Sequence, residues 1–417
     1  MKSFAFALAI SFLTFTVAGG QTAMVHTIGL NAPNKIINAP AHSMIVSEAG
    51  TTMPNTGRLS IVDRFSGARH TLISGLPSAV SFLGGPAGDP DGPSGIALQG
   101  NRLWMTIGVG DSVVPGGGPG LETPNPTPSS PLFDSVLELT LPGGFATLDS
   151  GFVLTAAQQL LLNSGATVTL RNAEDRSITI RLVADLPNWR PAPRPDAPNN
   201  VKASHLYGVE VWNKSLFLND AGHNDIKQVS RITGDWSVYV AFPPRVNPTP
   251  IGGPFIEAVP SNIHRFGNQL LVPMLTGFPF VQNFAEVRRV SLKDASDEQF
   301  IGGLTSAMDI LKVENDGDKG AAESTDAAGS IFVNGKRDAA QQLLTPGDGS
   351  SFYTLEFSTN MLMGAPGRLR FYATPDAAPV NVLSNLITPT SMARDGENGN
   401  LFITNIGPGT ITKVTFP

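Results

Sequence analysis

Residues 216–222 read LFLNDAG. An apolar run is followed by two polar residues and then by alanine and glycine. Runs of this kind, closing in polar or small residues, recur along the chain from residues 44, 103, 216, 270, 352 and 401. After each run comes a segment that alternates apolar and polar residues, such as 225–229 (DIKQV). Alternation with a period of two is typical of half-buried β-strands. The chain therefore predicts six copies of one β-rich unit.

Two further strands complete most of these units. Segments of small residues, often opened by proline, precede the runs, as in 93–97 (PSGIA) and 389–393 (PTSMA). Small residues suit a crowded inner strand near an axis, and an outer strand such as 71–77 ends several units. Six four-stranded units predict an all-β fold, a six-bladed β-propeller. The last unit stops after its third strand at Val414, so we expect the N-terminal strand, 24–30, to close the ring.

Uneven spacing between the units indicates small insertions in blades two and five of a single domain that covers 24–417. We expect an excursion over 143–182, with a helix over 155–163 and two strand-like runs. We expect a second insertion over 314–349, between the first two strands of blade five. Its acidic cluster starts like a calcium loop but lacks the EF-hand spacing, which favours a solvated loop. The cluster comprises Glu314, Asp316, Asp318, Glu323 and Asp326.

Composition excludes several classes of protein. The 417 residues include 44 glycines and 34 prolines, which are poor in helix interiors and argue against a helical bundle. The formal net charge is −6 and no long basic run is present, which argues against a dedicated nucleic-acid binder. The absence of cysteine excludes disulfides, thiolate metal sites and a cysteine nucleophile.

The N-terminus has the layout of a secretory signal peptide over residues 1–20. Lys2 precedes an uncharged apolar run over 4–17, and small residues follow it. The run is shorter than the roughly 20 residues that span a bilayer, although a retained N-terminal anchor is the alternative. We therefore expect a secreted protein, extracellular or periplasmic, that is soluble and monomeric after cleavage.

Several motifs resemble those of the ScyD/ScyE family of secreted propeller proteins. The most specific is 275–280 (LTGFPF), followed by 285–290 (AEVRRV). Supporting segments are 46–50 (VSEAG) and 220–224 (DAGHN), and the likeness spans nearly the whole mature chain. The resemblance implies an exported six-bladed propeller, related in fold to the NHL and SMP-30 propellers. Most members of the family have no assigned activity.

One column of polar residues recurs at the ends of the second strands. It holds Glu48, Asp220, Glu356 and Asn405. Rotational repetition would direct these oxygens toward one face, and Ca²⁺ prefers carboxylate and carbonyl oxygens. The four residues are therefore metal-ligand candidates, with Ca²⁺ as the candidate cofactor. The alternative is that each side chain accepts backbone N–H bonds within its own turn.

The inner strands supply a second candidate set, because they border the axial channel. We expect Ser94, Asn262, Asp309 and Thr390 to line it, together with His205. A desolvated His205 could act as a general base. The alternative is a hydrogen-bonded structural histidine.

The sequence leaves open whether the protein is an enzyme, since it contains no nucleophile elbow, zincin motif, phosphate loop or dinucleotide fingerprint. We expect a binding or scaffold module that uses the axial channel face, with a small molecule, polysaccharide or protein as its partner. The alternative function is a Ca²⁺-dependent hydrolase of the lactonase or esterase type.

Overall fold

The computed structural model describes residues 15–16, 21–85, 87–118, 120–194, 200–313, 324–325, 331–333, 336–337 and 350–416. Most of the expected signal peptide lies outside these residues. So does the acidic cluster of Glu314, Asp316, Asp318, Glu323 and Asp326. Within the described residues no helix is long and apolar enough to cross a membrane.

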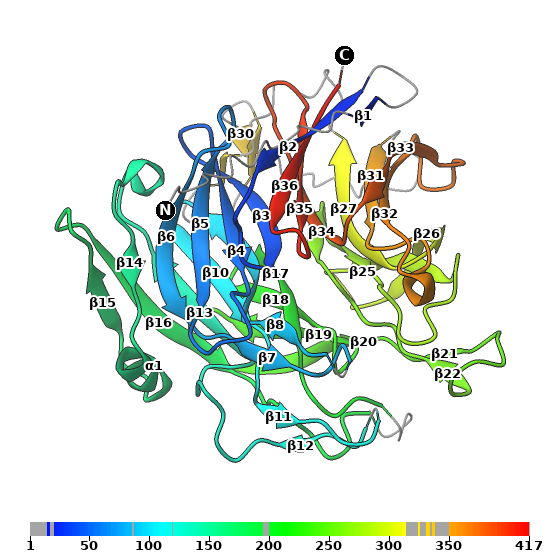
Figure 1. Ribbon diagram of the computed structural model, residues 1–417, viewed down its shortest axis with the longest axis horizontal. Coiled ribbons are helices and arrows are strands. Elements are labelled where there is room, and N and C mark those ends of the chain that lie inside the picture. The colour runs from blue at the N-terminus through cyan, green and yellow to red at the C-terminus, as the bar shows by residue number, and fades with distance from the viewer. Residues whose placement is uncertain are drawn as a thin grey trace, which may run out of the picture.

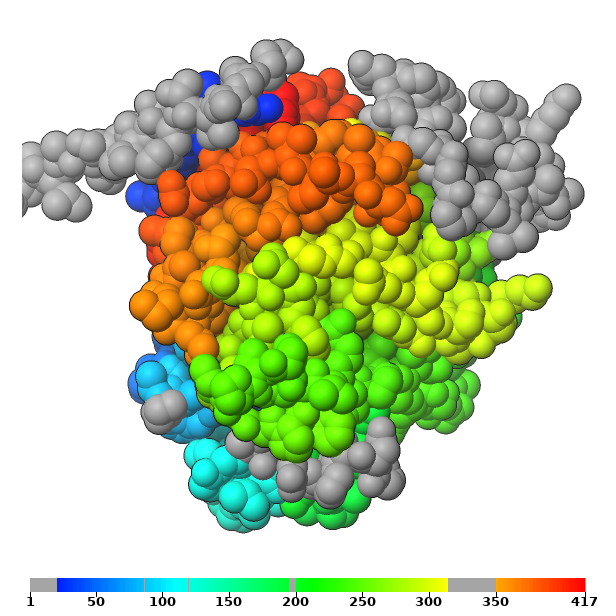
Figure 2. All heavy atoms as spheres, turned by 90° about the vertical axis from the view of Figure 1, so that its right-hand side faces the viewer, coloured from blue at the N-terminus to red at the C-terminus, as the bar shows by residue number. Residues whose placement is uncertain are grey.

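The prediction of an all-β, six-bladed propeller is confirmed, and successive blades follow one another around the molecule (Figures 1 and 2). The first three blades, each given from its inner to its outer strand, are β3 (Pro33–Ala39), β4 (Ser43–Glu48), β5 (Gly57–Asp63) and β6 (Arg69–Leu76); β9 (Pro93–Gln99), β10 (Arg102–Ile107), β13 (Ser135–Thr140) and β16 (Ser177–Asp185); and β17 (Leu206–Trp212), β18 (Ser215–Asp220), β19 (Asp225–Ser230) and β20 (Trp236–Ala241). The last three are β23 (His264–Phe266), β24 (Gln269–Pro273), β25 (Ala285–Ser291) and β26 (Asp297–Leu304); β27 (Ala307–Val313), β31 (Ser351–Glu356), β32 (Gly367–Tyr372) and β33 (Val380–Leu386); and β34 (Pro389–Arg394), β35 (Leu401–Asn405), β36 (Thr410–Thr415) and β2 (Thr22–Thr27).

The N-terminal strand closes the ring, as the sequence predicts. β2 pairs antiparallel with β36, with Met24 opposite Lys413, so the two ends of the chain share the sixth blade (Figure 1). This closure gives β36 a partner on both sides. It also removes an edge that would otherwise be open for pairing with another chain.

The segment 143–182 contains the helix that the sequence predicts, and it also supplies blade strands. The helix α1 (Ala156–Asn163) begins after Thr155, whose side chain forms a capping box with Gln158. β16 is the fourth strand of blade two, and β15 (Val168–Arg171) adds a fifth. β14 (Phe152–Val153) pairs in parallel with β6 of blade one, so the segment joins two neighbouring blades.

The remaining elements are short and lie in the connections between strands. They are β1 (Phe15–Thr16), β7 (Ala79–Ser81), β8 (Asp89–Asp91), β11 (Val113–Val114), β12 (Thr123–Pro124), η1 (Phe145–Thr147), β21 (Arg245–Val246), β22 (Phe255–Ile256), β28 (Ser324–Thr325), β29 (Ile331–Val333), β30 (Lys336–Arg337) and η3 (Met361–Met363).

The hydrophobic core is divided among the interfaces between blades, with one buried apolar cluster at each of the six. Between blades one and two, for example, Ile45 packs in one cluster with Met105. The other five clusters join each remaining pair of neighbours, including blades six and one, where Ile36 and Phe402 share a cluster. Since every blade covers a face of the next, the core depends on the whole ring.

Neighbouring inner strands approach so closely that glycine is required at one position. A Cβ atom added to Gly95 of β9 would lie 2.5 Å from the carbonyl oxygen of Tyr207 on β17. This explains the small residues that the sequence places in the inner strands.

We expect the substitution Gly95→Ala to destabilise the protein by about 1–3 kcal/mol, because the added methyl group forces two strand backbones apart. Gly143→Ala is the matched control, since a Cβ atom at Gly143 meets nothing within 4 Å. Urea unfolding of both variants measures the difference. Equal stability of the two variants would contradict the close approach.

Candidate functional site

The inner strands are joined across the blades by hydrogen bonds from side chains to the main-chain carbonyls of the next blade. Blade one reaches blade two through Ser47 Oγ, which donates to the carbonyl of Ser94 at 2.5 Å. Thr106 Oγ1 of blade two donates to the carbonyl of Tyr207 at 3.1 Å. Asn219 of blade three donates to the carbonyl of Pro260 at 2.8 Å. These bonds satisfy carbonyl groups that no adjacent strand reaches.

Three of the predicted channel residues belong to this inter-blade network. Asn262 Nδ2 donates to the carbonyls of Met308 (2.9 Å) and Thr390 (3.1 Å). Thr390 Oγ1 donates to the carbonyl of Pro33 (2.9 Å), which links blade six to blade one. Ser94 is buried and its hydroxyl donates to the carbonyl of Gly92. The geometry favours a structural role for all three.

Two members of the predicted metal column are engaged in ion pairs within their own blades. Glu48 is fully buried, and its Oε2 accepts from Arg58 Nη2 at 2.6 Å and from the backbone N–H of Asn31 at 2.5 Å. Glu356 is also fully buried and pairs with Arg368, while the backbone N–H of Thr305 donates to its Oε1. Burial raises the pKa of Glu356 to about 7, and Arg370 opposes that rise.

Asp220 is the most heavily committed member of the column. Its Oδ1 accepts from the backbone N–H groups of His205, Gly222 and His223 at 2.9–3.0 Å. Its Oδ2 lies 2.5 Å from Lys227 Nζ, which also donates to Asp225 at 2.6 Å. Burial alone would raise the pKa of Asp220, but Lys227 and His223 hold it well below its usual value.

The residues of this column do not fit a Ca²⁺ site. Asn405 Nδ2 donates to Thr412 Oγ1 at 3.0 Å, and Asn405 Oδ1 is buried without a hydrogen-bond partner among the described residues, so this column offers a cation a single uncommitted amide oxygen. The carboxylates of Glu48, Asp220 and Glu356 are already neutralised by arginine, lysine or backbone N–H groups. Among the described residues, no group of three or more histidine or acidic side chains is arranged to hold a metal ion.

We call the side of the propeller at which the inner strands begin the start face. His205 lies there among three carboxyl groups. Its Nε2 is 3.4 Å from Asp91 Oδ2, and its ring packs edge-on to Tyr207. Burial would lower the pKa of His205, but Asp91, Asp134 and Asp220 raise it to about 9. His205 is therefore protonated at neutral pH and lacks the free lone pair that a general base needs.

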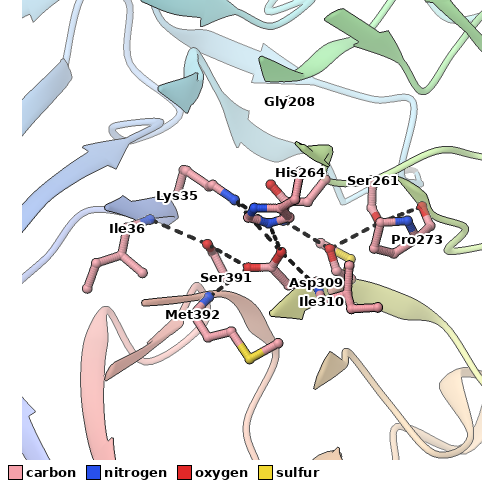
Figure 3. Close-up of polar contacts among 12 residues, drawn as sticks. Lys35, Ile36, Gly208, Ser261, His264, Pro273, Asp309, Ile310, Ser391 and Met392 are labelled. Atoms are coloured by element: carbon pink, nitrogen blue, oxygen red, sulfur yellow. Dashed lines mark hydrogen bonds and ion pairs between the residues drawn. The ribbon is translucent and has the colours of Figure 1, made fainter. Parts of the chain in front are cut away.

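The fourth predicted channel residue, Asp309, lies in a charged cluster that spans three blades (Figure 3). Asp309 Oδ1 is 2.5 Å from His264 Nε2, which is in turn 3.1 Å from Lys35 Nζ. Blades one and four face each other across a six-bladed ring, so Lys35 reaches across the axis to His264. Ser391 Oγ and the backbone N–H of Met392 donate to Asp309 Oδ2 at 3.0 and 2.8 Å and fix the carboxylate.

Proton positions in this cluster follow from the two contacts of one ring nitrogen. His264 Nε2 carries either a proton or a lone pair, so it cannot donate to Asp309 and also accept from a lysine ammonium group. Burial opposes ionisation of Asp309, but Lys35 and His264 still lower its pKa, so Asp309 is a carboxylate. The proton then lies on Nε2, so the ring does not accept a hydrogen bond from Lys35, whose Nζ lies 3.8 Å from Asp309 Oδ1. Burial likewise lowers the pKa of Lys35, although Asp309 opposes that shift.

We call the side of the propeller at which the inner strands end the end face. A cavity of about 350 Å³ opens there. Small-molecule sites in proteins usually begin at about this size. The cavity is lined by Lys35, Ile36, Ile37, Asn38, His264, Leu311, Lys312, Met392, Ala393, Arg394 and Gly396. Lys35 and His264 belong to both the lining and the buried cluster, so the cluster borders the cavity.

Sequence reasoning missed Lys35 and His264 for identifiable reasons. The segment 33–36 (PNKI) resembles the proline-opened inner strands at 93–96 and 389–392, and this alignment would have placed Lys35 beside the channel. His264 lies two residues after the predicted residue Asn262. Residues two apart lie on the same side of a strand.

Comparison with known proteins assigns neither a family nor an activity to the chain. No protein-family model matches the chain, and no curated protein matches it, so membership of the ScyD/ScyE family stays a prediction. Among solved structures, an auxiliary nutrient-binding protein from Bacteroides thetaiotaomicron is similar, with a TM-score of 0.48, 10% identity, and coverage of 93% of this chain and 69% of that chain. A gluconolactonase from Xanthomonas campestris is similar with a TM-score of 0.45 and 9% identity, and the match covers 96% of this chain and 90% of the gluconolactonase. The calcium structure of a family AA12 carbohydrate-active enzyme from Trichoderma reesei is similar with a TM-score of 0.49 and 12% identity, and the match covers 98% of this chain and 99% of that enzyme.

We expect Lys227→Met to destabilise the protein by about 3–5 kcal/mol, because it leaves two buried carboxylates, Asp220 and Asp225, without their cation. Lys214→Met is the control: Lys214 is exposed, and we expect a change within about 0.5 kcal/mol. Urea unfolding at pH 7 measures both values. Similar stability of the two variants would show that Lys227 does not hold these carboxylates.

We expect His205 to titrate near pH 9 in the folded protein, above its usual value of 6.5. Because the folded-state pKa of His205 is raised, the charged ring contributes to the free energy of unfolding. This contribution is fully present below pH 6.5 and is lost as the pH rises through 9. NMR titration of the six histidines, assigned with a His205→Gln variant, measures the value. A midpoint between pH 6 and 7 would mean that Asp91 does not charge the ring.

Proposed function

We propose that the protein is an exported binding protein that takes a small organic anion into the cavity on its end face. The observation that carries this proposal is the chemistry of the cavity lining. Three basic side chains, Lys35, Lys312 and Arg394, meet there with His264, and no lining residue is acidic. A cavity with one sign of charge raises the local concentration of ligands of the opposite sign.

Two of these basic groups are free to meet a ligand. Within the described part of the chain, neither Lys312 nor Arg394 forms an ion pair; Lys312 Nζ lies 5.2 Å from the ring centroid of Phe266. The Nε atom of Arg394 is buried and has no hydrogen-bond partner among these residues. A buried guanidinium donor without a partner costs free energy, and a carboxylate or other oxyanion would satisfy it.

The rest of the lining indicates an organic ligand rather than a bare inorganic ion. Ile36, Ile37, Leu311 and Met392 supply apolar surface beside the basic groups. Binding sites for small molecules commonly combine apolar walls with a few polar groups that fix orientation. A short carboxylic acid or sugar acid matches both the charge and the volume of this cavity.

The Ca²⁺-dependent hydrolase is the weaker alternative. Its metal ligands would be Glu48, Asp220, Glu356 and Asn405, whose polar atoms are largely committed within their own blades. Its base would be His205, which is protonated at neutral pH. We therefore derive no reaction step through a metal ion.

Isothermal titration calorimetry of the mature protein with small carboxylates and their neutral amides tests the proposal. We expect the carboxylates to bind and the amides to bind at least about tenfold more weakly, because a hydrogen bond to a charged group contributes about 1.5–3 kcal/mol. Added salt should weaken carboxylate binding, since the mouth of the cavity is open to solvent.

Lys312→Gln and Arg394→Gln should each weaken carboxylate binding by about tenfold or more on the same grounds. Lys293→Gln removes an exposed lysine outside the cavity lining and should leave the affinity unchanged. Equal affinity for carboxylates and amides, or equal effects of all three substitutions, would contradict an anion site on the end face.

A further inference from the structure

We propose that Lys35 captures its ligand covalently and reversibly, by forming an imine with the carbonyl group of an anionic carbonyl compound such as a 2-oxo acid. This inference rests on the proposed anion site and names the class of ligand more closely. Its basis is the position of Lys35, which lines the cavity and whose amine lies 3.1 Å from His264 Nε2 (Figure 3).

The first requirement for imine formation is an amine that gives up its proton readily, and burial favours this by lowering the pKa of Lys35. Asp309 holds the proton of His264 on Nε2, so the nitrogen that faces Lys35 cannot accept a hydrogen bond from an ammonium group. The Lys35 side chain is 7% exposed, so water does little to stabilise its charged form. Two acids oppose this loss of the proton. Asp309 Oδ1 lies 3.8 Å from Lys35 Nζ, and the Glu210 carboxylate, which accepts from the backbone N–H groups of Val211 and Arg265, also favours the charged form of Lys35.

The second requirement is a place for the rest of the ligand. Lys35 lines the cavity together with Lys312 and Arg394, which lie at the ends of inner strands β27 and β34. A carboxylate held by these two groups would place its neighbouring carbonyl carbon within the same cavity as the amine. The anion site therefore concentrates and orients the carbonyl compound.

The third requirement is a group that moves protons, and His264 supplies it. The Lys35 nitrogen attacks the carbonyl carbon, an N–C bond forms, and the carbonyl oxygen takes the Nε2 proton of His264. The nitrogen then loses a proton to His264, which passes a proton to the carbinolamine hydroxyl. The hydroxyl leaves as water while the C=N bond forms, and the resulting iminium gives its N–H proton back to His264. The balance is one amine and one carbonyl compound to one imine and one water, with no oxidation or reduction.

Trapping with pyruvate and sodium cyanoborohydride tests the inference on the unmodified protein at pH 7. We expect peptide mass mapping to find reduced pyruvate adducts at Lys35 faster than at the exposed residues Lys214 and Lys293, because burial lowers the pKa of Lys35 and leaves more free amine at pH 7. Labelling of Lys35 no faster than of these two lysines would overturn the proposal. Propionate, which has a carboxylate but no ketone or aldehyde group, should slow labelling of Lys35 alone.

A variant separates this inference from the anion site on which it rests. Lys312→Gln should slow the labelling of Lys35 by pyruvate but leave its labelling by uncharged acetaldehyde unchanged. Carboxylate binding without trapping at Lys35 would overturn only the covalent step. Trapping by acetaldehyde and pyruvate at equal rates, with no carboxylate binding, would instead overturn the anion site.

His264→Gln should flatten the pH profile of labelling, an effect that a purely structural role would not produce.

Discussion

The inner strands of this propeller have one edge that no neighbouring strand covers, and the rest of the structure depends on how that edge is satisfied. The carbonyls along it face the channel axis, where unpaired main-chain groups cost free energy. The chain meets this demand with side chains of the preceding blade, as Thr106 does for Tyr207 and Thr390 does for Pro33. Asn38 Nδ2 of blade one donates in the other direction, to the carbonyl of Arg394 in blade six, so the channel is braced by the same contacts that join the blades.

This bracing explains why polar residues beside a channel need not form a ligand site. Ser94, Asn262 and Thr390 are polar because main-chain groups need partners there. The blade-five position differs, since Asp309 presents a carboxylate to the ring of His264 instead of an amide or hydroxyl group to a carbonyl. Lys35 then reaches across the axis to the same cluster. The charged cluster of Lys35, His264 and Asp309 thus borders the cavity.

The sequence predicts the fold well because the fold repeats. Six copies of one strand pattern, with a spare strand at the N-terminus, lead directly to a closed six-bladed ring, and the helix after Thr155 follows from its capping residues. The candidate site is harder to predict, since it joins Lys35, His264 and Asp309 from three blades that are far apart in sequence. Asp309 is among the predicted channel residues. Lys35 is not, because the strand pattern does not predict the inner strand of blade one, β3.

Strand register explains why the predicted metal column forms ion pairs instead. In an antiparallel pair, residues directly opposite each other bring their side chains together. Glu48 stands opposite Arg58, and Glu356 stands opposite Arg368. Both arginines open the alternating run that follows, so each pairing can be read from the spacing of the two strands. A carboxylate at the end of a second strand can serve as a metal ligand only where the opposite third-strand residue leaves it free. In this chain the cross-strand partner, and not the acidic residue itself, distinguishes a ligand column from a set of buried ion pairs.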